Sequence, residues 1–298
     1  MRHRIADATV TVVDGAGAPV AGHDVVVAQR RHRFHFGGTD FDLVDLANGE
    51  LSGERRVIVE RSSAAFLDLF DFATLPFYLG RFEPVRGRPD TARIRTAARW
   101  LVDRGCLVKG HPLCWHSVTA DWLTELPVEE VIDVALARIR RDVADFAGLI
   151  DTWDVINEVV IMPVFDRGEN GITKMAQRLG RVGIVQATFE AARETNPGAT
   201  LLLNDFDMSA EYERLIEGCL DAGIRIDALG LQSHMHQGYW GVEKTLDVLD
   251  RFSRFGLPIQ FTESTLVSGH LMPPEIVDLN DYQVADWPTT PEGEARQA

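Results

Sequence analysis

Short apolar runs that alternate with longer amphipathic runs are the feature that most constrains how this chain can fold. The runs predicted to be strands are FHFGG, LVKGH, TWDVINE, TLLLND, ALGLQSH and PIQFTE, with FATLPFYL as a weaker candidate because it contains Pro76. The predicted helices span residues 53–70, 91–104, 128–146, 173–194, 210–218 and 242–255. Such alternation predicts a parallel sheet with crossover helices, either doubly wound or closed as a (β/α)₈ barrel.

Polar residues at the ends of the predicted strands favour the barrel. These residues are His111, Asn157, Glu158, Asn204, Asp205, Gln232, His234 and Glu263. Barrel enzymes collect their chemistry from the carboxyl ends of several strands. No G-x-G-x-x-G motif follows the first strand, which argues against a dinucleotide-binding sheet. We therefore predict an α/β protein with a TIM-barrel architecture.

Composition narrows the choice of partners. The chain has 298 residues, is 45% hydrophobic and carries a net charge of −15, with 45 acidic against 30 basic residues and no basic cluster. Nucleic acid is an unlikely partner for such a surface. No apolar run approaches the roughly 20 residues of a membrane span, and the amino terminus does not resemble a secretion signal, so the protein is expected to be cytoplasmic or to lack its leader here. The three cysteines are expected to be buried free thiols. The oligomeric state is left open.

Both ends of the chain depart from the alternation. Residues 1–32 read as a small β unit of two strands around a turn rich in Gly and Pro, expected to pack on a barrel formed by residues 33–298. After Glu263 the pattern stops, and the remaining residues predict a long loop and a helix start at Pro291. The barrel is therefore expected to lack its last helix–strand–helix unit, and its two edge strands are expected to stay unpaired.

Glu158 and Glu263 carry the chemical prediction. Each follows an apolar strand, so a barrel would point both carboxylates into one mouth. Two carboxylates across one site suit glycoside hydrolysis, in which one donates a proton and the other acts as nucleophile or base.

The motifs GHPLCWHSVTADW, TWDVINE, LLLND, GLQSH and FTE occur in the order found in the family-10 glycoside hydrolases, which the chain resembles from about Phe34 to Thr265. The family's best-known members are endo-β-1,4-xylanases. The resemblance implies a retaining hydrolase of β-1,4-linked plant-wall polysaccharides or oligosaccharides, most of all xylan-like ones, with no cofactor and no metal. It also implies that Glu158 is the acid/base and Glu263 the nucleophile. The substrate-binding residues that it implies are His111, Trp115, Asn157, Asn204, Gln232 and His234.

Two departures from the family concern the substrate. Where the family carries an Asn-Glu pair and a Lys, this chain reads ATLPFYLGRFEPVRGRP, which leaves Tyr78, Arg81 and Glu83 as the candidates to replace them. Unmatched hydroxyl partners change which sugar a site accepts, so xylan specificity is in question. After Glu263 the usual Leu-Asp becomes Ser264-Thr265, a milder change.

The same residues also permit other interpretations. The chain could be an inactive fragment or a carbohydrate-binding relative, and an H-x-H motif at a barrel strand could hold zinc through His234, His236 and His111. Trp115 could be an ordinary core aromatic. For two residues the plainer interpretation is preferred: Trp122 is expected to pack its loop and Asp205 to support the loop after its strand. His116 is expected to be a structural histidine.

Overall fold

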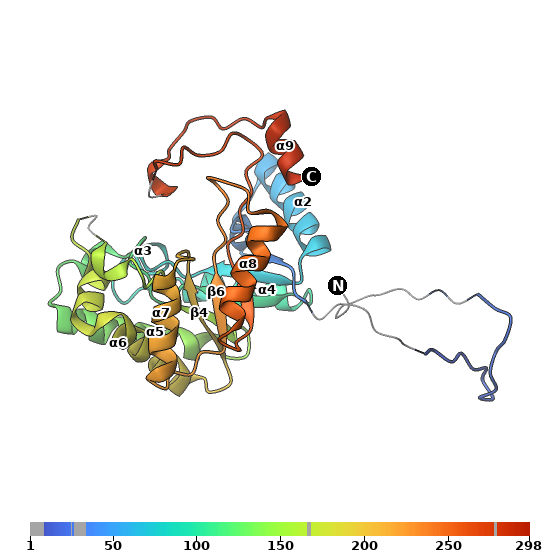
Figure 1. The fold of residues 1–298 in the computed structure, drawn as a ribbon, viewed down its shortest axis with the longest axis horizontal. Helices are drawn as coiled ribbons and strands as arrows, with labels where there is room; N and C mark the ends of the chain where they lie inside the picture. The colour runs from blue at the N-terminus through green and yellow to red at the C-terminus, as the bar shows by residue number, and fades with distance from the viewer. Residues whose placement is uncertain (1–8, 25, 27–33, 166–167, 277–278) are drawn as a thin grey trace. The chain divides into compact units, whose positions relative to one another are not determined.

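Seven parallel strands in chain order form one sheet in the computed structural model, which describes residues 9–24, 26, 34–165, 168–276 and 279–298 (Figure 1). The strands are β1 Gly37–Gly38, β2 Phe72–Pro76, β3 Leu107–His111, β4 Thr152–Asn157, β5 Thr200–Asp205, β6 Ala228–Leu231 and β7 Ile259–Phe261. Each strand pairs with the next one in the sequence. This is the strand order of a (β/α)₈ barrel, and it excludes the reversal of order that marks a doubly wound sheet.

A helix follows each strand, after a loop of varying length. The helices are α1 Asp42–Ala47, α2 Gly53–Leu69, α3 Leu79–Phe82, α4 Thr91–Val102, α5 Val128–Phe146, α6 Gly171–Thr195, α7 Ala210–Asp221, α8 Gly241–Ser253 and α9 Pro291–Gln297, with the 3₁₀ turns η2 Asp121–Leu123, η3 Met162–Val164 and η4 Leu279–Asp281. None of the helices in the described part of the chain is long and apolar enough to cross a membrane.

The six predicted helices are all present; α5 has the predicted bounds, and the other five differ from the prediction at one or both ends. Helix α6 begins two residues early because the side chain of Asn170 accepts a hydrogen bond from the Thr173 N–H (3.0 Å), a cap that the prediction overlooked. Helix α7 continues past Gly218 to Asp221. The short helices α1 and α3 were not predicted, since four to six residues are too few for a periodic pattern.

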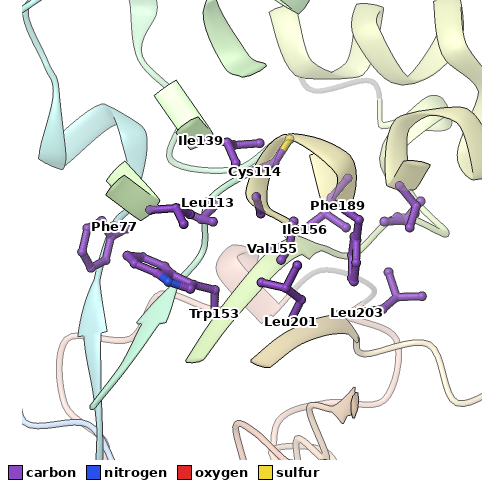
Figure 2. Packing of buried hydrophobic residues seen from close by; sticks show 14 of the residues in the cluster. Phe77, Leu113, Cys114, Ile139, Trp153, Val155, Ile156, Phe189, Leu201 and Leu203 are labelled. Atoms are coloured by element: carbon purple, nitrogen blue, oxygen red, sulfur yellow. The ribbon is translucent and has the colours of Figure 1, made fainter. Parts of the chain in front are cut away.

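The core lies between the sheet and its helices, and Trp153 of β4 is at its centre (Figure 2). Its ring is fully buried and meets Phe77 edge-on at 4.8 Å between centroids. A side chain at Gly110 on β3 would place its Cβ 2.1 Å from the Trp153 ring, so this strand position needs glycine. Truncating Trp153 to alanine would cost about 3–5 kcal/mol of folding free energy, as for other buried aromatics.

A β-bulge brings the polar ends of two central strands level with each other. The pairing of β4 with β5 shifts between Asp154 and Ile156. After this shift Asn157 lies opposite Asn204 in the parallel register. Bulges commonly re-aim side chains beside active sites, and here the bulge aligns Asn157, which precedes Glu158, with Asn204 near the end of β5.

The edges of the sheet and the two ends of the chain were predicted in outline. In the described residues β1 pairs only with β2, β7 pairs only with β6, and no strand follows β7. Helix α9 begins at Pro291 as predicted, and Met272 in the preceding loop is 2% exposed, so the loop is better packed there than expected.

The amino-terminal unit, residues 1–35, is separate from the unit formed by residues 36–298. The Asp14 side chain accepts hydrogen bonds from the N–H groups of Ala16 and Ala18 and closes a turn. Val13 and Pro19 form one antiparallel bridge across it. Two full strands were predicted, but the described residues hold this bridge alone, and much of the second predicted strand lies outside them.

Candidate active site

Glu158 and Glu263 each follow the end of a strand, and the backbone N–H of each is hydrogen-bonded at the end of the neighbouring strand. The N–H of Glu158 donates to the Asn204 carbonyl (2.9 Å), and the N–H of Glu263 donates to the Gln232 carbonyl (3.1 Å). Glu158 has a φ of 60°, a left-handed backbone conformation that a residue with a side chain rarely adopts. Strain of this kind persists where surrounding contacts impose it, and it turns Glu158 out of the strand direction.

Three amide side chains join the two carboxylates into one hydrogen-bond network. The Gln232 amide group donates to both Glu158 Oε1 (3.1 Å) and Asn157 Oδ1 (3.0 Å). The Asn204 amide group donates to the same Asn157 oxygen (2.8 Å) and to Glu263 Oε1 (2.9 Å). Asn157, Asn204 and Gln232 are each at most 1% exposed, so their orientation is fixed by the core. The sequence-predicted acids and amides therefore belong to a single cluster.

His234 completes the network on the side of Glu263. Its Nε2 lies 2.9 Å from Gln232 Oε1 and 3.3 Å from Glu263 Oε2. Since an amide carbonyl oxygen can only accept, Nε2 carries the hydrogen, and its N–H points at both acceptors. His234 thus holds the Glu263 carboxylate and the Gln232 amide in fixed orientations.

The environments of the two acids shift their pKa values in opposite directions. Burial raises the pKa of Glu158, the charge of Glu263 adds to this, and hydrogen bonds from Trp115 and Gln232 oppose it. Burial would also raise the pKa of Glu263, but the hydrogen bond from His234 and nearby positive charge hold it below its ordinary value. One carboxyl group is therefore biased towards the neutral acid and the other towards the carboxylate.

Trp115 is bound to the acid rather than packed in the core. Its indole Nε1–H donates to Glu158 Oε2 at 2.8 Å, and its ring lies 5.7 Å from that of Tyr78. His116 is 2% exposed with Nε2 3.7 Å from the same carboxylate oxygen, so this histidine also faces the site.

His111 owes its orientation to a buried charge pair that sequence reasoning missed. Its Nδ1 lies 2.8 Å from Asp154 Oδ2, and the Lys109 ammonium lies 2.7 Å from the same oxygen. Burial would raise the pKa of Asp154, but the charge of Lys109 and the hydrogen bond from His111 lower it, so Asp154 is a carboxylate and Nδ1 of His111 is the donor. The available signal was a Lys and an Asp in the middle of apolar strands, since buried charges need partners.

The remaining sequence-predicted residues take supporting positions. Asp205 accepts hydrogen bonds from the N–H groups of Val160 and Asp207, which confirms that it supports loops. Trp122 packs against the core and donates to the Glu83 carbonyl (3.0 Å), as predicted. All three cysteines are buried and free, also as predicted, and burial raises the pKa of the Cys114 thiol to about 12.

The described residues contain no side-chain cluster that supports the metal interpretation. Within the described residues, no group of three or more His, Cys, Asp or Glu side chains is arranged to hold a metal ion. His234 and His236 do lie side by side, with ring centroids 5.4 Å apart.

Comparison with known proteins places this arrangement in a family. Endo-1,4-beta-xylanase A of Xylanibacter ruminicola is 32% identical over 167 residues, which are 52% of this chain and 44% of that protein. Endo-1,4-beta-xylanase B of Thermotoga neapolitana is 28% identical over 188 residues, 60% of this chain and 53% of that protein. The chain thus spans about half the length, or less, of these curated relatives.

Solved structures agree on the fold. A GH10 structure from Paenibacillus barcinonensis superposes with a TM-score of 0.68 at 22% identity, covering 89% of this chain and 76% of that one. Xylanase 10B of Thermotoga petrophila, solved with xylobiose, gives 0.64 at 24% identity, with 80% and 73% covered. The sequence profile of glycosyl hydrolase family 10 matches residues 79–270, a span that holds both strand-end acids and the amide network. This chain belongs to glycosyl hydrolase family 10.

Proposed function

We propose that the protein is a retaining glycoside hydrolase that cleaves β-1,4-linked, xylan-like polysaccharides or oligosaccharides. The observation that carries the proposal is the pair of acids in one hydrogen-bond network with pKa values shifted apart, Glu158 upward and Glu263 downward. Hydrolysis by double displacement needs a neutral acid and an ionised nucleophile at the same pH. No metal or cofactor enters this chemistry.

In the first step the Glu263 carboxylate attacks the anomeric carbon and the glycosidic C–O bond breaks. Glu158 gives its proton to the departing oxygen, which leaves as an alcohol. In the second step the ionised Glu158 takes a proton from water, and the resulting hydroxide attacks the anomeric carbon. The ester bond to Glu263 then breaks, which restores the carboxylate, while Glu158 is again protonated.

The buried amides and histidines have supporting roles in this proposal. Asn157 meets the sugar 2-hydroxyl, a contact that strengthens in the transition state. Asn204 and His234 orient the nucleophile, because both lie against Glu263. His111 and Trp115 line the subsite at the cleavage point, and Gln232 links Asn157 to the acid.

The substrate class follows from the relatives, whose names are those of endo-1,4-beta-xylanases, and from a structural neighbour that holds xylobiose. One wall of the subsite differs from the family pattern. Glu83 is 4% exposed, binds the Gly87 N–H and pairs with Arg141, so its carboxylate is unavailable to a sugar. Tyr78 instead lies edge-on to His111 with ring centroids 5.6 Å apart, which makes its phenol the candidate to contact the sugar at this wall, whereas Arg81 is exposed. We therefore propose that this wall makes fewer hydrogen bonds to the sugar hydroxyls than the family pattern does.

Kinetics on aryl xylobiosides of graded leaving-group ability test the two roles. Glu158→Ala should lose most rate on poor leaving groups and little on activated ones, and azide should restore part of it, because only protonation is lost. Glu263→Ala should lose turnover on every leaving group, because the covalent step is lost. Glu211→Ala, at an exposed glutamate paired with Arg214, is the matched control and should behave as wild type.

Two results would overturn the proposal. Equal losses across leaving groups in both acid variants would contradict the division of roles. A wild-type chain that binds xylo-oligosaccharides without any turnover would identify a carbohydrate-binding relative instead. Parallel assays on aryl glucosides and arabinosides identify the preferred sugar.

A further inference from the structure

Arg138 of helix α5 is a buried charge on a helix face whose other buried residues, apart from Asp142, are apolar. Its side chain is 6% exposed, and its neighbours on that face include Ala135 and Ile139, both core residues. An arginine in such a place costs folding free energy unless its charge and all its donors find partners. The carboxylate of Asp142, one helical turn further on and itself fully buried, lies 3.1 Å from Nε and supplies the counter-charge.

The outer end of the guanidinium binds backbone carbonyls of two different loops. Nη1 donates to the Leu113 carbonyl (2.6 Å), and Nη2 donates to the carbonyls of Phe77 and, at 3.5 Å, Pro112. Phe77, Leu113 and Ile139 of α5 all belong to the buried apolar cluster that Figure 2 shows. A planar fork of fixed N–H directions suits several acceptors at once, which a lysine ammonium on a flexible stem does not.

These carbonyls belong to the segments that carry the subsite wall. Phe77 immediately precedes Tyr78, and Pro112 and Leu113 lie between His111 and Trp115. Within this region the Phe77 N–H also donates to the His111 carbonyl (2.7 Å). Arg138 therefore links the segment that follows β2 to the segment that follows β3.

The same segment continues to the acid itself. The Leu113 N–H donates to the Asp154 carbonyl (3.0 Å), and the Cys114 carbonyl accepts from the Asn157 N–H (2.9 Å). The next residue is Trp115, whose indole N–H binds Glu158. Leu113 therefore lies two residues before the tryptophan that binds Glu158, in a segment whose backbone is hydrogen-bonded to β4.

We propose that Arg138 is a positioning residue for the hydrolytic site. It touches neither acid; it fixes the two loops that present Tyr78, His111 and Trp115, and through Trp115 it tunes the protonation of Glu158. The role in catalysis rests on the proposed glycosidase function, whereas the effect on the two loops does not.

Arg138→Lys and Arg138→Met test the proposal in the full chain, with Arg140→Met as matched control. Arg140 is on the same helix but exposed, and its ion pair with Glu194 spans 3.4 Å. Lysine keeps a cation beside Asp142, so this variant folds even if the methionine variant does not. Peptide-resolved hydrogen–deuterium exchange follows residues 76–82 and 111–118, and kcat/KM is measured against pH on an aryl xylobioside.

Both Arg138 variants should exchange faster in these two segments, while the strands β4 and β5 stay protected. Their kcat/KM should fall about 10- to 100-fold, as expected for misplacement by about 1 Å. The alkaline limb of the pH profile should move upward, because a weakened Trp115 contact favours the neutral form of Glu158. Arg140→Met should change none of these quantities.

The proposal is overturned if Arg138→Lys leaves exchange in both segments at the wild-type rate. It is also overturned if exchange rises equally throughout the core, which would mean a role in stability alone. An inactive wild-type chain whose Arg138 variants still loosen these segments would refute the proposed function but leave the loop-fixing role standing.

Discussion

Replacing Trp115 with phenylalanine removes one hydrogen bond from the acid while keeping an aromatic ring in the site. The lost bond is the 2.8 Å contact from the indole N–H to Glu158 Oε2, on a carboxyl group whose side chain is 13% exposed. This contact favours the ionised form, so its removal should raise the pKa of Glu158 further above its ordinary value. Activity that needs a protonated Glu158 should then persist to higher pH.

The size of the pKa shift follows from the free energy that the hydrogen bond contributes. A hydrogen bond to a charged group contributes about 1.5–3 kcal/mol. One pKa unit corresponds to about 1.4 kcal/mol, so the alkaline limb of kcat/KM should move upward by about one to two pH units. The acid limb, set by the ionisation of Glu263, should hardly move, since Trp115 does not bind that carboxylate.

The assay is the pH dependence of kcat/KM on an aryl xylobioside with a poor leaving group, so that protonation limits the rate. Trp122→Phe is the control: its indole N–H donates to the Glu83 carbonyl, away from both acids, and its profile should match wild type. An alkaline limb that stays in place or moves downward in Trp115→Phe would refute the assignment of Glu158 as the proton donor.

Three further outcomes are expected. In an experimental structure the carboxyl groups of Glu158 and Glu263 should lie about 5–5.5 Å apart, and a separation above about 6.5 Å would indicate an inverting site. Burial raises the pKa of Asp205 to about 7 from an ordinary 3.8, so its contribution to folding free energy is largest below pH 3.8 and is lost as pH rises through 7; the stability advantage of wild type over Asp205→Asn in urea should shrink over that interval. Chelator treatment should leave activity unchanged, and activity that vanished and returned with zinc would support the metal interpretation instead.

The elements that the sequence predicts best are those with long periodic patterns. Helix α5 has the predicted bounds, because its apolar stripe runs through 19 residues. Strands such as β5 are continuous apolar runs because both faces of a parallel barrel strand are buried, one under the helices and the other in the barrel interior. The two-residue strand β1 and the four-residue helix α3 carry too little pattern to be bounded in advance.

The residues of the site also fall into those that could be predicted from the sequence and those that could not. Glu158 and Glu263 could be singled out from the sequence because each follows an apolar strand and because the motifs around them, TWDVINE and FTE, resemble those of the family. The supporting groups were not predictable, because their partners lie far away in the sequence. Asp154 pairs with Lys109, 45 positions earlier, and Arg138 binds the carbonyl of Phe77, 61 positions earlier. Such pairings depend on how strands and helices meet in space, which periodicity within one segment does not reveal.

The shared amide network also affects where this protein would undergo slow chemical damage by deamidation. Deamidation of Asn157 or Asn204 would turn an amide into a carboxylate inside a cluster that already holds two. It would also remove a donor to Glu158 in the case of Asn157 and a donor to Glu263 in the case of Asn204. The reaction begins when the next residue's backbone nitrogen attacks the side-chain carbonyl. For Asn157 that nitrogen is held by the Asn204 carbonyl at 2.9 Å, and its side-chain oxygen is occupied by two donors. Prolonged heating below the unfolding temperature should therefore spare the centre of the site, and chemical damage should begin at a less buried asparagine such as Asn48, which precedes Gly49.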